Sequence, residues 1–185
     1  MTGRHDYIIT KNGKENIKKL SEKLKFLNID SIYSSPAERA IKTIQSIANL
    51  NNLKIITDTN LDEMFFGIYD GLKWEDVDKI NPIIHKIQIQ TNEIKNIPDQ
   101  ESMEQVADRM YKCISNICLN NPEKSVLIAS HGVAIEAFLR KITGDKFAIK
   151  RDKYRQFNTN INELEYDFDS NSFKIITLND ITHLQ

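Results

Sequence analysis

Several features that would place this chain in a specialised class are scarce or missing from its 185 residues. No apolar run is long enough to cross a bilayer, and Met1 to Tyr7 lack the apolar centre of a secretory signal. The formal net charge is −1 at pH 7, so no basic excess points to nucleic acid or to an acidic membrane surface. The composition therefore predicts a cytoplasmic globular protein with no nucleic-acid and no membrane partner.

Cysteine is rare as well, and its placement argues against a metal site. The two cysteines, Cys113 and Cys118, fall in one predicted helix and, five residues apart, do not share a helix face. No cluster of histidines and cysteines surrounds them, as a zinc site would require. We expect both thiols to be reduced, in the core or at its boundary.

The chain does contain a regular alternation of strand and helix signals, over a length that suits one domain, residues 1–185. Apolar spacing predicts helices at about 11–27, after Pro36, at 102–119 and from 132 to Gly144, and strands at 31–33, 53–56, 126–129, 162–168 and 172–178. Ser102 and Gln105 form a predicted capping box, and residues 73–95 indicate short helices broken at Pro82. This order predicts a three-layer α/β/α fold whose mostly parallel sheet includes at least one antiparallel strand.

The strongest single site signal is the segment from Val126 to Gly132. A buried strand brings His131 to its carboxyl end, where open α/β sheets bind their ligands. The free N–H groups at the start of the following helix favour an anion, phosphate above all. The alternative is that His131 only caps the helix or fills a gap in the packing.

Two further segments carry weaker signals. Arg39 lies in the first turn of a helix, an unfavourable place for a cation, which suggests another duty such as a bidentate phosphate contact. The stretch from Leu61 to Gly71 combines acids, aromatics and glycines, and a carboxyl beside aromatics can serve as a general acid. Taken alone, the Arg39 signal is weak, since a lone arginine is usually a solvated surface residue. For the second stretch, composition alone favours an ordinary packed loop with solvated acids.

Together, and in this order, the three segments resemble the histidine phosphatase superfamily, whose members are phosphoglycerate-mutase-like. The family pattern Tyr-Ser-Ser-x-x-x-Arg-Ala-x-x-Thr matches Tyr33 to Thr43. The pattern Leu-x-Glu-x-x-x-Gly-x-x-Glu-Gly matches Leu61 to Gly71, with Asp70 where Glu is usual. The remaining matches are Glu101-Ser102 ahead of Arg109, Ser130-His131-Gly132 after an apolar strand, and Asn158 before the last strands. The ordered set covers nearly the whole chain and is far more specific than any one motif.

The start of the chain departs from that family. Its members open with a strand ending in Arg-His-Gly-Glu, which carries the histidine nucleophile. Residues Gly3 to Gly13 instead fit the family's second element, Gly-Arg-x-Asp-x-x-Leu-Thr-x-x-Gly, with Ile9 in place of Leu. His5 then falls at a variable position, and no apolar strand precedes it. We therefore expect the family's first strand, which lies inside the sheet beside the 126–129 strand, to be absent from this sequence.

The resemblance implies a phosphomonoester hydrolase that acts on a small phosphorylated metabolite through a phosphohistidine intermediate, without metal or organic cofactor. Arg39 would clamp phosphate oxygens, His131 would stabilise charge on the transferring group, and Glu63 would protonate the leaving oxygen. The phosphate-binding set it implies is Arg39, His131, Gly132, Ser34 and Asn158.

Two alternatives to an active phosphatase stay open. A phosphoglycerate mutase is the first, although the short insert between 73 and 100 favours a phosphatase of small phosphomonoesters. The second is a catalytically inactive phosphate-binding domain, which the missing nucleophile favours and the retention of Arg39, Glu63 and His131 disfavours. The chain is expected to be a monomer or a homodimer, with activity impaired by the missing nucleophile.

Overall fold

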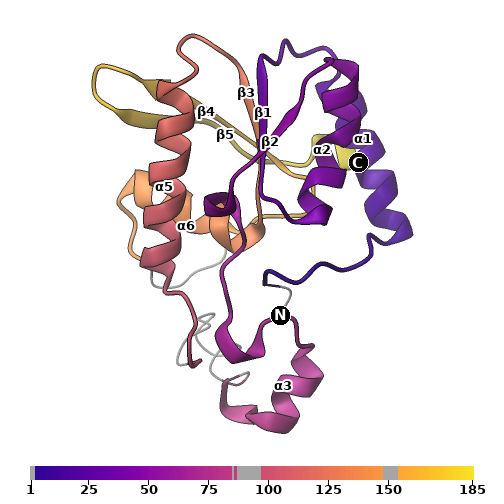
Figure 1. Ribbon diagram of the computed structural model, residues 1–185, viewed down its shortest axis with the longest axis vertical. Helices are drawn as coiled ribbons and strands as arrows, with labels where there is room; N and C mark the ends of the chain where they lie inside the picture. The colour runs from indigo at the N-terminus through magenta and orange to yellow at the C-terminus, as the bar shows by residue number, and fades with distance from the viewer. Residues whose placement is uncertain (1–2, 85, 87–96, 148–153) are drawn as a thin grey trace.

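The computed structural model describes residues 3–84, 86, 97–147 and 154–185. It is a three-layer α/β/α structure, as the alternation of elements predicted, with a central parallel sheet between two helical layers (Figure 1). The helices are α1 (Lys11–Leu24), α2 (Glu38–Leu50), α3 (Trp74–Ile80), α5 (Met103–Leu119) and α6 (Gly132–Thr143). The strands are β1 (Ser31–Ser34), β2 (Ile55–Thr57), β3 (Val126–Ala129), β4 (Ile161–Asp167) and β5 (Ser172–Asp180), and short 3₁₀ turns are η1 (Thr59–Leu61), η2 (Gly67–Tyr69) and η3 (Thr182–Leu184).

The parallel sheet has the order β2-β1-β3, so its central strand comes first in the chain. β1 pairs with β3 from Ser31↔Val126 to Ser34↔Ala129, and with β2 from Ile32↔Ile55 to Ser34↔Thr57. Because the strands are parallel and in register, their carboxyl ends lie at one edge of the sheet. The segments that follow β1 and β3, which carry the predicted site residues, therefore begin side by side.

The antiparallel pair at the end of the chain was predicted correctly, but it stands apart from the parallel sheet. β4 and β5 pair with each other from Ile161↔Asp180 to Asp167↔Ser172 and form a two-stranded sheet of their own. Within the described residues, β3 pairs with β1 alone. β4 and β5 instead hold their place through apolar packing, with Leu164, Phe173 and Ile175 against the core of α5 and α6.

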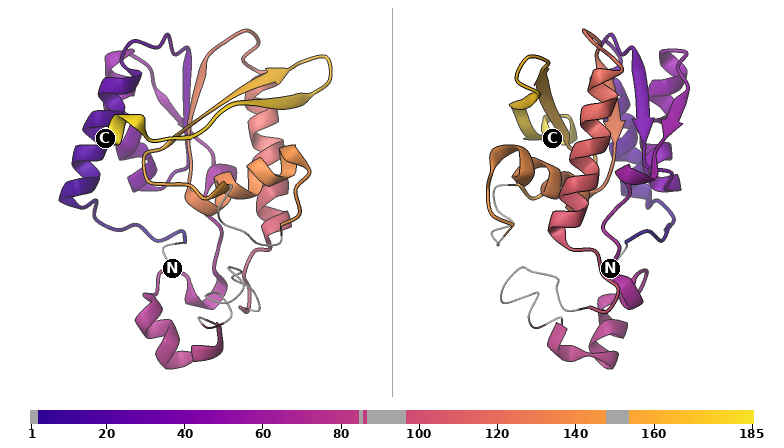
Figure 2. Two further views of the ribbon diagram at one scale, coloured as in Figure 1. Left: turned by 180° about the vertical axis from the view of Figure 1, so that it is seen from behind. Right: turned by 60° about the vertical axis from the view of Figure 1, so that its left-hand side comes forward.

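Helices cover both faces of the sheet (Figure 2), and each face has its own apolar core. On one face, Leu20 and Leu24 of α1 and Ile44 and Ile47 of α2 pack against Ile32, which is fully buried. On the other face, the core is formed mainly by α5 and α6, with Leu61 and Met64 from the loop after β2; its helical members include Val106, Met110, Ala134, Phe138 and Leu139. The two helical layers fix the ends of β1 and β3 from both sides.

Local signals set most element ends. The Ser102–Gln105 capping box at the start of α5 is present, and α6 ends at Gly144 in the left-handed conformation with φ 71°. α1 ends at Leu24, short of the predicted Leu27, and the residues beyond it do not extend its buried stripe: Phe26 is 85% exposed. Both cysteines are free thiols, and burial, followed by the neighbouring Asp58, raises the pKa of Cys113 to about 12.

Between Gly67 and Asp99 the chain leaves the main body and returns to it; the described part of this stretch is called the α3 region below. It projects beyond the edge of the sheet where the strands' carboxyl ends lie (Figures 1 and 2). Its core is a small apolar cluster of Tyr69, Val77, Ile84 and Ile97. α3 ends before Pro82 and a helical turn follows at 82–84, as predicted; residues 85 and 87–95 of the predicted short helices lie outside the described residues.

Candidate active site

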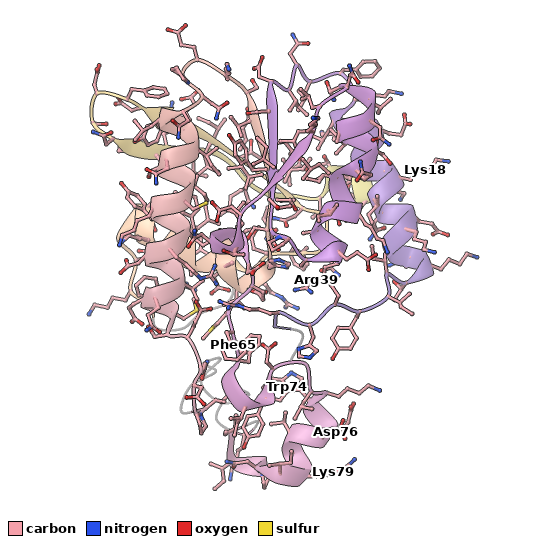
Figure 3. All side chains as sticks on the ribbon, in the orientation of Figure 1. Lys18, Arg39, Phe65, Trp74, Asp76 and Lys79 are labelled. Atoms are coloured by element: carbon pink, nitrogen blue, oxygen red, sulfur yellow. The ribbon has the colours of Figure 1, made fainter. Side chains whose placement is uncertain are left out.

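The structure brings Arg39 and His131 together. Arg39 lies in the first turn of α2, just after β1, and His131 directly precedes α6, just after β3. The Arg39 Nη2 atom is 3.1 Å from His131 Nδ1, although the residues are 92 positions apart in the sequence. Figure 3 shows Arg39 at the end of α2 that faces the α3 region. Two helix starts and two strand ends thus meet at one place, called the candidate site below.

Arg39 is held by the first residues of the described chain. Its guanidinium donates to the carbonyl oxygens of Gly3 and His5, each at 2.6 Å, and to the carboxylate of Asp6 at 3.1 Å. The same carboxylate accepts hydrogen bonds from the backbone N–H groups of Glu38 and Arg39. Burial acts to raise the pKa of Asp6, but these hydrogen bonds and the charge of Arg39 outweigh it and hold the pKa below its ordinary value. An acid therefore lies at the start of α2, where the helix dipole favours negative charge.

His131 is buried and neutral. Its Nε2 atom is 2.7 Å from the Ser35 hydroxyl, and only 8% of the residue is exposed. Burial, and then the charge of Arg39, lowers its pKa to about 3. Because a guanidinium can only donate, His131 Nδ1 accepts the hydrogen bond from Arg39.

Glu63 lies at the start of α6, immediately beyond His131. Its carboxylate accepts hydrogen bonds from the backbone N–H groups of Met64 at 2.9 Å, Val133 at 3.2 Å and Ala134 at 3.0 Å. Burial raises the pKa of Glu63 despite these bonds. Gly132 leaves the carboxylate room, since a Cβ there would lie 4.0 Å from Glu63 Oε2. Glu63 thus contacts the backbone of the residues that follow His131, and its predicted role as proton donor stays a prediction.

The loop that carries Glu63 is fixed by Arg109. The guanidinium donates to the carbonyl oxygens of Asn60 and Asp62 at 2.8 Å and of Glu63 at 3.1 Å, and to both carboxylate oxygens of Glu101. Glu101 also accepts from the Phe65 N–H at 2.8 Å. Sequence reasoning matched Glu101 and Arg109 to a family pattern but gave them no role. The structure shows them as a clamp on residues 60–65.

Among the described residues, the side chains of two predicted residues make no hydrogen bond to Arg39, Glu63 or His131. Ser34 is fully buried, and its hydroxyl donates to the carbonyl oxygen of Ser35. Asn158 is exposed, and in the described part of the chain no hydrogen bond joins it to Arg39, Glu63 or His131. The neighbouring Ser35, which sequence reasoning left without a role, makes the contact with His131 instead.

His5 makes its contacts away from His131. Its ring is 3.1 Å from the Asp70 carboxylate, lies against Gly71 and has 68% of its side chain exposed. Only its backbone carbonyl reaches Arg39. This agrees with the sequence pattern, in which His5 occupies a variable position.

Other features of the structure bear on ligands. Among the residues that the structure describes, no group of three or more His, Cys, Asp and Glu side chains is placed to hold a metal ion. No helix within that part of the chain is long and apolar enough to cross a membrane. A groove of about 620 Å³ beside α5, lined by Tyr33, Asp58, Arg109 and Cys113 among others, does not include Arg39 or His131, and we do not assign it to the candidate site.

Comparison with known proteins shows the family to which this chain belongs. The sequence model of the histidine phosphatase superfamily (branch 1) matches residues 1–181. A probable phosphoglycerate mutase GpmB of Proteus mirabilis is 29% identical over 187 residues, covering 98% of this chain and 86% of that protein. The chain therefore belongs to the histidine phosphatase superfamily, a family of phosphoglycerate-mutase-like enzymes.

Solved structures show the same fold. Bacillus stearothermophilus YhfR superposes with a TM-score of 0.91 at 20% identity, covering 100% of this chain and 91% of that one. Phosphoserine phosphatase from Entamoeba histolytica, solved in complex with 3-phosphoglyceric acid, superposes with a TM-score of 0.82 at 22% identity, covering 100% and 90%. Both confirm the three-layer phosphoglycerate-mutase-like architecture.

Proposed function

We propose that the candidate site binds the phosphate group of a small phosphomonoester, and that it is the site of a phosphomonoester hydrolase. The observation that carries the proposal is the meeting of Arg39 and His131, 3.1 Å apart, at the carboxyl ends of β1 and β3. A guanidinium supplies bidentate donors of the geometry that phosphate prefers. Ligands of open α/β sheets bind at this edge, and helix starts favour anions.

We assign each residue of the candidate site a role from the groups that surround it. Arg39 would bind the phosphate oxygens after releasing part of its present contacts with Gly3, His5 and Asp6. His131 would lie against the same group and stabilise the charge that builds up during transfer. Glu63, whose pKa is raised, would give a proton to the leaving oxygen, a contribution of typically ~10²–10⁴-fold. Gly132 would let the start of α6 approach the ligand.

The phosphohistidine step needs a nucleophile, and the contacts of His5 do not assign that role to it, because its ring is turned to Asp70. Among the described residues, no hydrogen bond joins the side chain of Ser34 or Asn158 to Arg39, Glu63 or His131, so their part in shaping the pocket stays a prediction. Phosphate binding and turnover are therefore tested separately.

A thermal-shift titration with inorganic phosphate or vanadate tests the binding. Either anion should raise the melting temperature of the wild type by mass action. Arg39→Ala should abolish most of that shift, while Lys18→Ala, which removes a cation from the outer side of α1 in Figure 3, should leave it intact. Equal protection of Arg39→Ala and wild type would place the anion elsewhere.

Hydrolysis of p-nitrophenyl phosphate tests the second half of the proposal. We expect a rate above that of the uncatalysed reaction, lost in Arg39→Ala and retained in His5→Ala. A wild-type rate at the uncatalysed background would count against a hydrolase. A rate well above background that is lost in His5→Ala would identify His5 as the nucleophile and overturn our placement of it.

A mutase remains the second candidate, because a relative similar over 98% of the chain is named a probable phosphoglycerate mutase. The two activities differ in their products. A mutase would convert 3-phosphoglycerate into its 2-phospho isomer with phosphate conserved on the acid, whereas a phosphatase would release inorganic phosphate. Phosphorus NMR of the reaction mixture separates them.

A further inference from the structure

Ser35 connects the two halves of the candidate site. It follows β1 directly, is fully buried, and receives a hydrogen bond from the backbone N–H of Ala37 at 3.1 Å. Its hydroxyl oxygen lies 2.7 Å from His131 Nε2 and 2.9 Å from Asp62 Oδ1. A histidine, a serine and an aspartate from three separate segments are thus joined in a row.

The direction of each hydrogen bond in this row follows from the chemistry of the groups. An ionised carboxylate only accepts, so the single hydroxyl proton of Ser35 goes to Asp62. The Ser35 oxygen must then accept from His131, which places a proton on Nε2. At the other side of the ring, the Arg39 guanidinium can only donate, so Nδ1 carries a lone pair. Both sides of the imidazole require the same tautomer.

We infer that Ser35 and Asp62 are positioning residues for His131: the row Asp62–Ser35–His131 fixes the Nε2–H tautomer and turns Nδ1 toward Arg39. The inference deepens the proposed function, since its purpose rests on phosphate binding beside Arg39. A third group that orients a histidine, and sets its tautomer through the far nitrogen, is a general device of sites in which histidine acts. Neither Ser35 nor Asp62 needs to touch the ligand.

The position of Asp62 is itself determined by the clamp described above. Its backbone carbonyl accepts a hydrogen bond from Arg109 at 2.8 Å, and its backbone N–H donates to the carbonyl of Thr59 at 3.1 Å. These bonds fix the Asp62 backbone at a position from which its carboxylate reaches Ser35. The same clamp holds the carbonyl of Glu63, so one guanidinium places both the proton donor and the residue that orients His131.

The alternative tautomer would be costly here. A proton on Nδ1 would point at the Arg39 guanidinium, donor against donor, and Nε2 would then present a lone pair to a serine whose proton already serves Asp62. Both hydrogen bonds of the ring would be lost in a buried place, where each unpaired group costs ~1–3 kcal/mol. A shift of tautomer is therefore a direct signature of losing the row.

Nitrogen-15 NMR of the histidine side chains of the full chain reads the tautomer without any need for activity. The chain has four histidines, and His131→Gln identifies the signals of His131 by their disappearance. At pH 7 we expect wild-type His131 to show a protonated Nε2 and an unprotonated Nδ1. Ser35→Ala should mix the two tautomers, Ser35→Thr should restore the wild-type pattern, and Ser21→Ala, a buried serine of α1, should not alter it.

Asp62→Asn gives a second, independent variant in case Ser35→Ala does not fold. An asparagine amide can donate to the Ser35 oxygen, which frees the hydroxyl proton to turn toward Nε2, so the population of the Nε2–H tautomer should fall. An Nδ1–H tautomer in the wild type would overturn the inference. So would an unchanged wild-type pattern in folded Ser35→Ala or Asp62→Asn.

Calorimetric titration with inorganic phosphate at pH 7 then separates this inference from the proposed function. We expect Ser35→Ala to weaken phosphate binding about 10-fold, the value of one hydrogen bond, and Ser35→Thr to weaken it less. If wild-type protein fails to bind phosphate while its tautomer depends on Ser35 as described, the proposed function fails and the row stands. If phosphate binds but the tautomer is indifferent to Ser35 and Asp62, the row fails and the proposed function stands.

Discussion

The candidate site and the α3 region lie next to each other beyond the same edge of the sheet, yet they are held together by different forces. In the candidate site, polar side chains bind groups far away in the sequence: Arg39 reaches across 92 positions to His131, and Glu63 across 71 to Ala134. In the α3 region, the described core is a small apolar cluster, and an ion pair such as that of Lys79 with Asp76 spans one helical turn. Hydrogen bonds are directional and fix the positions of their atoms to within fractions of an ångström. The contacts of a small apolar cluster tolerate the replacement of one apolar side chain by another.

The largest effect is expected from removing the clamp. Arg109→Met would remove the bidentate partner of Glu101, which would keep only its contacts with Arg4 and the Phe65 N–H, and would leave three backbone carbonyls without the Arg109 donor, so the free energy of unfolding should fall by ~3 kcal/mol or more. Urea denaturation followed by circular dichroism measures the loss. Lys112→Met, on the exposed side of the same helix, is the matched control and should change stability by less than ~0.5 kcal/mol. Similar losses in both variants would mean that the clamp contributes no more than a surface charge.

The next largest effect is expected on the pH dependence of stability, and it depends on His131. Its pKa in the folded protein, about 3, is below that of the unfolded chain, so the unfolded state takes up the proton first as the pH falls. The stability that neutral His131 contributes is therefore complete above pH ~6.5 and declines below it, by up to about 1.4 kcal/mol per pH unit. Denaturation curves between pH 7 and pH 5 should show this decline in the wild type and a flatter response in His131→Gln. Parallel responses would show that His131 is not buried as a neutral ring.

A smaller effect is expected from the apolar cluster. Val77 is fully buried in the α3 region, and Val77→Ala should cost ~1–2 kcal/mol for the methyl groups and the space they leave. Phosphate affinity, measured by the same titration as above, should stay within twofold of wild type. Ile80→Ala serves as control, because Ile80 is 61% exposed. A large loss of phosphate affinity in Val77→Ala would show that the two regions are coupled more tightly than their contacts indicate.

The smallest effect is expected on the surface of α3. Asp76 and Lys79, both labelled in Figure 3, form an exposed ion pair of 3.0 Å. Such pairs contribute little because water screens them, so Asp76→Asn should change the free energy of unfolding by less than ~0.5 kcal/mol. The same denaturation measurement in low salt would give the largest value the pair can reach. A loss above 1 kcal/mol would show that the ion pair has a role the exposed geometry does not suggest.

The sequence predicted those residues whose signals are local. Arg39 and His131 each lie at a helix start that follows a strand end, and Glu63 lies in a stretch marked by acids, aromatics and glycines. The capping box of α5 and the Gly144 stop are likewise indicated by a few neighbouring residues. The α1 end was misplaced by three residues because Leu27 continues the apolar spacing of Leu20 and Leu24, although the fold leaves Leu27 exposed.

Contacts between distant segments could not be predicted in this way. The sheet order β2-β1-β3 depends on pairing strands almost a hundred residues apart. Arg109 binds carbonyls 46 to 49 positions away, and no periodicity marks an arginine for that task. Ser35 was passed over in favour of Ser34 because alternation along a strand does not tell which of two adjacent serines meets a histidine that follows another strand.

The junction between the α3 region and the main body determines how freely the length of the Gly67–Asp99 stretch can vary. Phe66 pairs with Gln100, the Glu101 N–H donates to the Phe65 carbonyl at 3.0 Å, and the Ile68 N–H donates to the Pro98 carbonyl at 3.2 Å. Gly67 permits this closeness, since a Cβ there would lie 1.9 Å from the Pro98 oxygen. The excursion thus starts and ends at one tied junction.

A loop whose ends are already tied adds little conformational entropy when it is lengthened, about 0.6 kcal/mol for each doubling of its length. We therefore expect that the stretch from Gly67 to Asp99 can be replaced by a longer or shorter segment from another member of the superfamily. Residues 60–66 and 100–109 would be kept in such a replacement. Sequence changes in this stretch would then leave Glu63 and Asp62 where the junction and the clamp put them.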